Sequence, residues 1–298
     1  MFVRLTSARP LAARASGLLI RSLSLAPILL ACARGESRPA HEPSTAPGHA
    51  SAARAGIPRD VTLPGIAASR PAYIVRPAAD AGSIAGTVLL DGPAPPDTTV
   101  TPSPDDVHTC GPSLTFPTVE TKAGGVADAV VWLVGVEAGK PLPDLRRAEL
   151  ALDGCRLQPH LIAMMAGGAL NVHGIDVLDA RLRFTRVEGG TADEPPGTVL
   201  LRVTTTDGGQ VVPSGRVVAA PGTVEVRGEL QPWLRAWILA FDHPYFATTN
   251  TEGGFVLDGV PPGTYQLVAW HDRLGRAGQQ VTVGPGQTVQ VTVRLGGR

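Results

Sequence analysis

The sequence predicts an all-β protein, on three observations. Gly (35) and Pro (28) make up about a fifth of the 298 residues without a collagen-type period, while 43% of the residues are apolar. Short apolar or alternating segments recur at intervals of roughly 8 to 12 residues, with turn signals between them. Beyond the N-terminal segment, apolar residues do not recur at helical spacing for three turns. Two sandwiches joined near Pro232 and Trp233 fit this pattern best.

Strands are expected wherever an apolar or alternating run is bounded by turn residues. In the first folded unit they cover 83–92, 128–134, 148–152, 160–165, 169–173, 180–185, 198–203, 216–219, 223–227 and 235–241. In the second unit they cover 246–249, 254–257, 264–270, 279–283 and 289–295. Ala166-Gly167-Gly168 is a hairpin signal, and it predicts that 160–165 and 169–173 pair with each other.

The N-terminus has the features of an export signal. Residues 1–31 contain four arginines and no acid, and an apolar run at 23–31 is too short to span a bilayer. The run ends in Leu29-Leu30-Ala31-Cys32, which resembles the lipobox of bacterial lipoproteins. This resemblance implies lipidation of Cys32 and an anchor on the periplasmic face of the envelope, with the outer membrane as the expected site. An ordinary signal peptide cut at Ala31 or Ala33 is the alternative.

The mature chain has a modest acidic balance. Removal of 1–31 leaves 22 basic against 26 acidic residues, a net charge near −4, and no basic run remains for nucleic acid. Residues 32–80 are rich in Ala, Pro, Ser and Gly and are predicted to be a disordered tether. The folded part is predicted to divide into 81–237 and 238–298.

Cys110 and Cys155 form an even pair in an exported chain, which predicts a disulfide. Closing the 45-residue separation would stabilise the protein by roughly 4 kcal/mol in the chain-entropy model. Two buried free thiols are the alternative.

The C-terminal unit resembles a known family. Thr248 to Phe255 (TTNTEGGF) followed by Val260 to Leu267 (VPPGTYQL) is similar to the repeat of carboxypeptidase regulatory-like domains and of the carbohydrate-binding-like fold, including the second domain of rhamnogalacturonan lyases. The resemblance implies a prealbumin-like β-sandwich at 238–298, which is usually a non-catalytic accessory.

A second resemblance covers about Gly82 to Gly275. The stretches 82–88, 128–133, 155–160, 232–237 and 269–271 are similar to a bacterial family that fuses a plastocyanin-like cupredoxin domain to the regulatory-like unit. It implies a cupredoxin-like Greek-key sandwich at 81–237. In copper-binding members a Cys, a His and a Met surround the Pro-Trp pair, and a second His comes from an earlier loop.

The copper ligands of that family are absent here. The Cys position is Gly228, the His position is Gln231, the Met position is Leu234, and the earlier His position aligns with Asp179 or Ala180. Thiolate and imidazole form the strong bonds of a blue-copper site. The resemblance therefore implies a scaffold that has lost its metal, and no cofactor is expected.

Other histidines leave alternatives open. His173 lies near Asp176 and Asp179, so these three residues are candidates for a weak site for zinc or a harder ion. His160, His243 and His271 are expected to be hydrogen-bonded structural residues, with metal ligation as the alternative.

Trp237, Tyr245 and Trp270 are candidates for stacking on a glycan, because sugars pack on aromatic faces. The alternative is that these side chains, together with Trp233, fill the seam between the two sandwiches.

Catalytic motifs are missing from the sequence. No nucleophile elbow, Gly-rich phosphate loop or paired carboxylates at a recognisable spacing occur. The predicted function is therefore a non-enzymatic cell-envelope lipoprotein that acts as a binding or structural module, with an envelope protein or a glycan as its partner. The alternatives are a carbohydrate-binding accessory protein and a metal-binding or electron-transfer cupredoxin with altered ligands.

Overall fold

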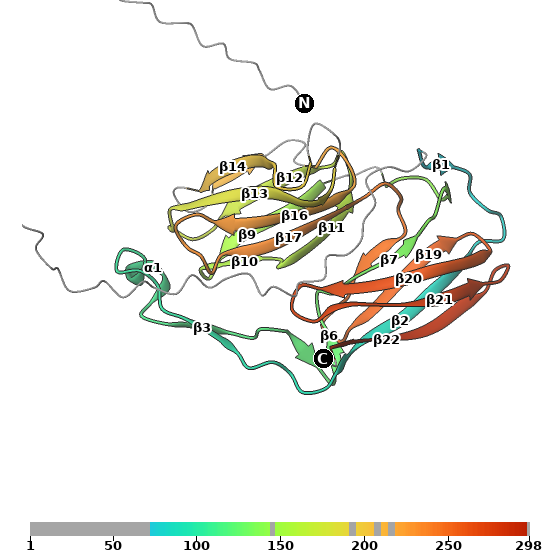
Figure 1. The fold of residues 1–298 in the computed structure, drawn as a ribbon, viewed down its shortest axis with the longest axis horizontal. Helices are drawn as coiled ribbons and strands as arrows, with labels where there is room; N and C mark the ends of the chain where they lie inside the picture. Colours follow the sequence, from blue (N-terminus) through green and yellow to red (C-terminus); the bar gives the residue numbers. More distant parts are fainter. Residues whose placement is uncertain (1–71, 144–146, 191–194, 206–209, 214–217, 297–298) are drawn as a thin grey trace, which may run out of the picture. The chain divides into compact units, whose positions relative to one another are not determined.

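The computed structural model describes residues 72–143, 147–190, 195–205, 210–213 and 218–296. Within these ranges the regular structure consists of strands and one helical turn, α1 (Val107–Cys110), so the predicted all-β fold is confirmed (Figure 1). No helix in the same ranges has the length and apolar character needed to cross a bilayer. Cys32, the export signal and most of the predicted tether lie outside the described residues.

Nine strands form one sandwich in the middle of the chain, which we call the inserted sandwich. One sheet has the order β11 (Leu161–Met165), β17 (Arg235–Phe241), β16 (Gly222–Gly228), β13 (Ala180–Gly189) and β14 (Val199–Thr205). The other has the order β10 (Arg156–Gln158), β9 (Arg147–Asp153), β12 (Ala169–Gly174) and β15 (Gln210–Pro213). Leu150, Leu170, Phe184, Val224 and Ile238 are buried in its core.

Strands from both ends of the described chain form a second sandwich, the outer sandwich. One sheet has the order β18 (Phe246–Thr248), β7 (Val130–Val134), β20 (Gly263–His271) and β21 (Gly275–Val283). The other has the order β19 (Gly254–Val260), β2 (Gly82–Asp91), β6 (Gly125–Val126) and β5 (Thr121–Lys122), and β22 (Thr288–Gly296) also pairs with β2. Ile84, Leu133, Leu257, Leu267 and Val293 are buried in its core.

Two small sheets complete the fold. β1 (Ile74–Val75) pairs in parallel with β8 (Ala138–Gly139). β3 (Thr98–Val100) pairs with β4 (Leu114–Phe116), and α1 lies between these two strands in the sequence. We call residues 93–118, which leave the outer sandwich after β2, the excursion.

The strand pairing corrects the predicted division at residue 237. β2 pairs with β22 in parallel from Ser83 to Asp91, and Figure 1 shows the two strands side by side. β7 lies between β18 and β20. The inserted sandwich therefore interrupts the outer one, which takes strands from residues 82–134 as well as 246–296. The sequence could not show this, because β2 and β22 are about 200 residues apart and no turn connects them.

The predicted hairpin at Ala166-Gly167-Gly168 is also wrong. β11 pairs with β17 in one sheet, while β12 pairs with β9 and β15 in the other. The Gly167 N–H donates to the Val218 carbonyl at 2.7 Å, so the turn carries the chain from one sheet to the facing one. A glycine-rich turn of this length is compatible with either connection.

The two sandwiches meet in a shared apolar layer, the seam. Strands that border the seam are buried on both faces. β17 directs Ile238 into the inserted core and Trp237 into the seam, while β7 directs Leu133 into the outer core and Trp132 into the seam. This double burial explains why 130–134 and 236–241 are continuous apolar runs rather than alternating ones.

Candidate functional site

The turn between β16 and β17 occupies the place where the cupredoxin resemblance puts copper ligands. The Gly228 N–H donates to the Leu234 carbonyl at 2.9 Å, and the Leu234 N–H donates to the Gln231 carbonyl at 3.0 Å. A Cβ atom on Gly228 would lie 2.4 Å from the Gln231 carbonyl oxygen. No side chain, including a cysteine, therefore fits at residue 228 unless the turn moves.

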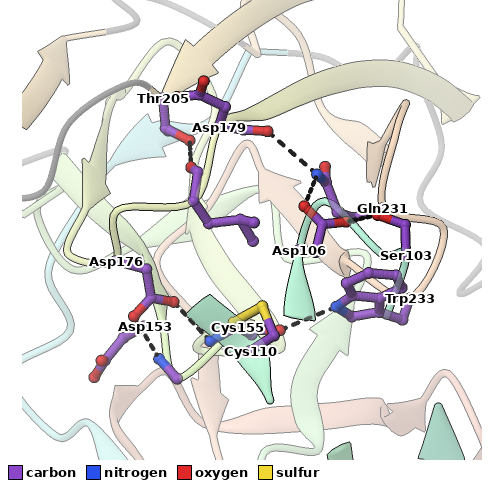
Figure 2. The surroundings of a disulfide bond; sticks show 12 residues. Ser103, Asp106, Cys110, Asp153, Cys155, Asp176, Asp179, Thr205, Gln231 and Trp233 are labelled. Carbon is purple, nitrogen blue, oxygen red and sulfur yellow. Dashed lines mark hydrogen bonds between the residues drawn. A yellow bond between two sulfur atoms is a disulfide. The ribbon is translucent and has the colours of Figure 1, made fainter. Parts of the chain in front are cut away.

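Gln231 links this turn to two other loops (Figure 2). Its buried Nε2 donates to Asp106 Oδ1 at 3.1 Å and to the Asp179 carbonyl oxygen at 3.2 Å. The hydroxyl of Ser103 donates to the other oxygen of Asp106 at 2.7 Å. The residues aligned with the copper site therefore do meet in space, and a hydrogen-bonded amide stands at the aligned His position.

These residues do not fit copper. Gly228 offers no side chain, Leu234 is a fully buried hydrocarbon in the inserted core, and Asp179 meets Gln231 through its backbone carbonyl. A blue-copper site needs thiolate and imidazole donors, and neither is present on this loop.

We expect Gln231→Ala to lower the free energy of unfolding by about 1 to 2 kcal/mol, because the buried carboxylate of Asp106 and the carbonyl oxygen of Asp179 lose their donor. Urea denaturation measures the effect. Gln290→Ala, which truncates an exposed glutamine of β22, is the matched control and should change stability by less than about 0.5 kcal/mol. Equal effects of the two variants would contradict a structural role for Gln231.

The predicted weak metal site does not form. His173 Nε2 is paired with Glu149 Oε2 on the neighbouring strand β9. The carboxylate of Asp176 accepts the N–H groups of Gly154 at 3.2 Å and Cys155 at 2.6 Å (Figure 2). No group of three His, Cys, Asp or Glu side chains suited to a metal ion occurs in the part of the chain that the structure describes. The prediction failed because these polar side chains are used within the loop and the sheet.

The predicted disulfide between Cys110 and Cys155 is confirmed, with a Cα–Cα distance of 5.7 Å. It ties α1 of the excursion to the turn between β9 and β10, and both cysteines are buried. Trp233 Nε1 donates to the Cys155 carbonyl at 3.2 Å, beside the bridge (Figure 2). The disulfide and the Gln231–Asp106 hydrogen bond together hold the excursion on the end of the inserted sandwich that would carry the metal.

The three aromatic residues proposed for glycan stacking are buried. Trp237 is 2% exposed, and Tyr245 and Trp270 are 0% exposed. The rings of Trp237 and Trp270 meet edge to face in the seam, with their centroids 5.6 Å apart. The Tyr245 hydroxyl donates to the Gly259 carbonyl and accepts the Lys140 N–H inside the outer sandwich. The seam interpretation is therefore correct for Trp237 and Trp270, whereas Tyr245 lies in the outer core and Trp233 packs against the inserted core. The stacking site on Trp237, Tyr245 and Trp270 is excluded.

A cavity of about 310 Å³ lies where the excursion and the two sandwiches meet, and we call it the seam cavity. The excursion and the β5–β7 region contribute Phe116, Glu120 and Asp128. The inserted sandwich contributes Arg156, His160, Trp233 and Arg235, and the end of β20 and the turn after it contribute His271 and Arg273. These residues comprise five basic groups that carry or can carry charge, two carboxylates and two aromatic rings.

Buried ion pairs form one wall of the seam cavity. Asp272, whose side chain is 1% exposed, lies 2.7 Å from His160 Nε2 and 3.3 Å from Arg273 Nε. Burial alone would raise the pKa of Asp272, but the attraction of His160 and Arg273 holds it below its ordinary value. A second buried acid, Glu225, lies 2.8 Å from Arg235 Nε and 2.7 Å from Arg227 Nε.

The geometry fixes the protonation of the two seam histidines. His160 faces the Asp272 carboxylate through Nε2 and the Arg235 carbonyl, 3.3 Å away, through Nδ1. Both partners only accept, so His160 is an imidazolium. Burial alone would lower the pKa of His160, but Asp272 outweighs it and raises that pKa. His271 Nδ1 accepts the Arg273 N–H, and burial lowers the pKa of His271 to about 4, so His271 is neutral.

The structure places His271 beside His160. The ring of His271 lies 6.2 Å from that of His160, whereas His243 packs beside Phe241 and Tyr245. His160 and His271 are hydrogen-bonded structural residues, as predicted. The sequence did not single out Asp272, Arg235, Glu225 or Asp128. The only local signal was an acid or base within or beside a buried strand, and the His160 partner of Asp272 is 112 positions away.

We expect the stability of the protein to fall as the pH drops from 6.5 to about 4. The pKa of His271 is lower in the folded state, so the unfolded state binds the proton first and is favoured by acid. His271 alone contributes on the order of 3 kcal/mol across this window. Urea unfolding at several pH values measures the slope. His271→Gln should reduce it, and an unchanged slope would contradict the assignment.

These features define the class of the protein: an all-β chain in which one sandwich interrupts another, with a disulfide-linked excursion at their junction. Residues 198–296 match the family model of the carboxypeptidase regulatory-like domain. The matched residues run from β14 to β22, so they include strands of both sandwiches. This match agrees with the regulatory-like resemblance in the sequence.

The structure was also compared with solved structures. It is similar to reduced auracyanin from the photosynthetic bacterium Roseiflexus castenholzii, with a TM-score of 0.25, 10% identity, and coverage of 32% of this chain and 97% of that chain. No curated protein matches the sequence.

Proposed function

We propose that this protein is an exported, lipid-anchored module of the cell envelope without enzymatic activity. In this proposal a cupredoxin-like scaffold acts as a binding or structural unit and carries no copper. The observation that supports it most directly is the Gln231 hydrogen-bond network, which joins the aligned copper positions to the excursion instead of to a metal.

The state of the polar groups also supports a non-enzymatic role. Both nitrogens of His160 have acceptors, so its imidazole cannot take a proton from a substrate. The described cysteines are joined in a disulfide, which leaves no thiolate nucleophile among the described residues.

Export is supported by the disulfide, because such bonds persist in oxidising compartments such as the periplasm. The Leu29-Leu30-Ala31-Cys32 tetrad at the end of the apolar run supports lipidation of Cys32. The tether would allow the folded part to extend away from the membrane surface. The outer membrane is the proposed location.

Mass spectrometry of the mature N-terminus from a bacterial host tests the anchor. We expect a chain that begins at a diacylglyceryl-modified Cys32 and fractionates with membranes, while Cys32→Ser should leave the membrane fraction. A mature chain that begins at Ala33, or an unmodified Cys32 in the soluble fraction, would overturn the anchored part of the proposal. Cross-linking in the native envelope then identifies the partner.

A further inference from the structure

The seam cavity contains carboxylates that form no ion pair. Among the described residues, the side chains of Glu120 and Asp128 line the cavity without a hydrogen bond or ion pair; Glu120 is exposed, and half-buried Asp128 is attracted by the charge of His160. Burial raises the pKa of Asp128, and the charge of Glu120 raises it further, so the two carboxylates are near enough to repel. Asp128 also has a left-handed backbone (φ 56°), which Asp and Asn tolerate better than most residues. A cation between these two carboxylates would relieve their repulsion.

The basic side of the seam cavity has unused donors. The Arg156 guanidinium lies 5.7 Å from the centre of the Phe116 ring and has no carboxylate partner among the described residues. A guanidinium is well shaped for a carboxylate, so Arg156 can bind one. Arg235, in contrast, already pairs with Glu225 and lies over the Trp237 ring, and Arg273 and His160 already have Asp272 as their partner.

Size and walls limit the ligand to a small molecule. A volume of about 310 Å³ is at the lower end of the range for small-molecule pockets, too small for an oligosaccharide or a folded peptide. Phe116 and the half-buried Trp233 provide aromatic surface for an apolar body. A purely anionic ligand would leave Glu120 and Asp128 unpaired, and a purely cationic one would leave Arg156 unpaired.

We propose that the seam cavity binds a small zwitterion of the α-amino acid type, with its ammonium group at Asp128 and Glu120 and its carboxylate at Arg156. An apolar side chain would pack against Phe116 and Trp233. This site would supply a ligand for the module proposed above, but it depends on neither the lipid anchor nor an envelope partner. A failure of one proposal would therefore leave the other standing.

Calorimetric titration of the full-length protein in detergent tests the site with three probes. L-Phenylalanine carries both charges, 3-phenylpropanoate lacks the ammonium group, and phenethylamine lacks the carboxylate. We expect saturable binding of L-phenylalanine and at least about tenfold weaker binding of each of the other two. Equal binding of 3-phenylpropanoate, equal binding of phenethylamine, or no binding of L-phenylalanine would each overturn the proposal.

Two variants test which residue binds the carboxylate of the ligand and which binds its ammonium group. Arg156→Gln should weaken the binding of L-phenylalanine at least about tenfold and leave the binding of phenethylamine unchanged. Asp128→Asn keeps the shape of the side chain, and Asn also tolerates the left-handed backbone at this position. It should weaken the binding of L-phenylalanine and of phenethylamine but not that of 3-phenylpropanoate. Arg276→Gln, at an exposed arginine of β21 outside the cavity, is the control and should change no affinity. An effect of Arg276→Gln equal to that of Arg156→Gln would show that binding is non-specific and would contradict the site.

Discussion

Replacing Cys110 and Cys155 together with serine should lower the free energy of unfolding by about 4 kcal/mol. The bridge joins two residues 45 positions apart, and this link lowers the conformational entropy of the unfolded chain. It also joins the excursion to the inserted sandwich, where the Gln231–Asp106 hydrogen bond is a much weaker link. Urea denaturation of the oxidised protein and of the double variant measures the loss.

A reduced sample of the unaltered protein is the control for this double variant. It should unfold at the same urea concentration as the serine variant, because both lack the bond. Limited proteolysis should cut the variant first within 101–111, where α1 loses its covalent attachment. Equal stability of the variant and the oxidised protein would contradict a structural role for the bridge.

Asp272→Asn should lower the free energy of unfolding by about 3 kcal/mol. The change keeps the shape of the side chain but removes the negative charge that balances His160 and Arg273 beside the seam. We expect the lower end of the range for a broken buried ion pair, since the His160 side chain is 30% exposed. Urea denaturation measures the stability, and NMR titration should show a lower pKa for His160 in the variant.

Asp258→Asn is the matched control for Asp272→Asn. Asp258 pairs with Lys140 at the surface, where its side chain is 79% exposed, so the variant should lose less than about 1 kcal/mol. Similar losses in the two variants would show that burial does not decide the contribution of Asp272.

The all-β class and the disulfide could be predicted because both depend on local signals. Strand-length apolar runs with turn residues between them predict strands, and an even pair of cysteines in an exported chain predicts a bridge. The apolar runs 130–134 and 236–241 also predicted strands. Their partners could not be inferred, since an apolar strand can pair with any other.

The domain boundary and the seam cavity could not be predicted, for a common reason. β2 joins β22, and Asp272 joins His160, through contacts between residues that are 112 or more positions apart. The aromatic residues near Pro232 suggested either a seam or a sugar site, and only their burial decides between the two. Likewise, alignment placed Gln231 at a ligand position, but only the geometry shows its hydrogen bonds to Asp106 and Asp179.

The central claim is that the turn holding Gly228, Gln231 and Leu234 binds the excursion and no copper. Adding Cu(II) to the purified protein and recording its visible absorption tests this claim most directly. We predict no intense thiolate-to-copper charge-transfer band, because no free thiolate or imidazole lies on this turn. One tightly held copper per chain with an intense visible band, lost on Gln231→Ala, would contradict it.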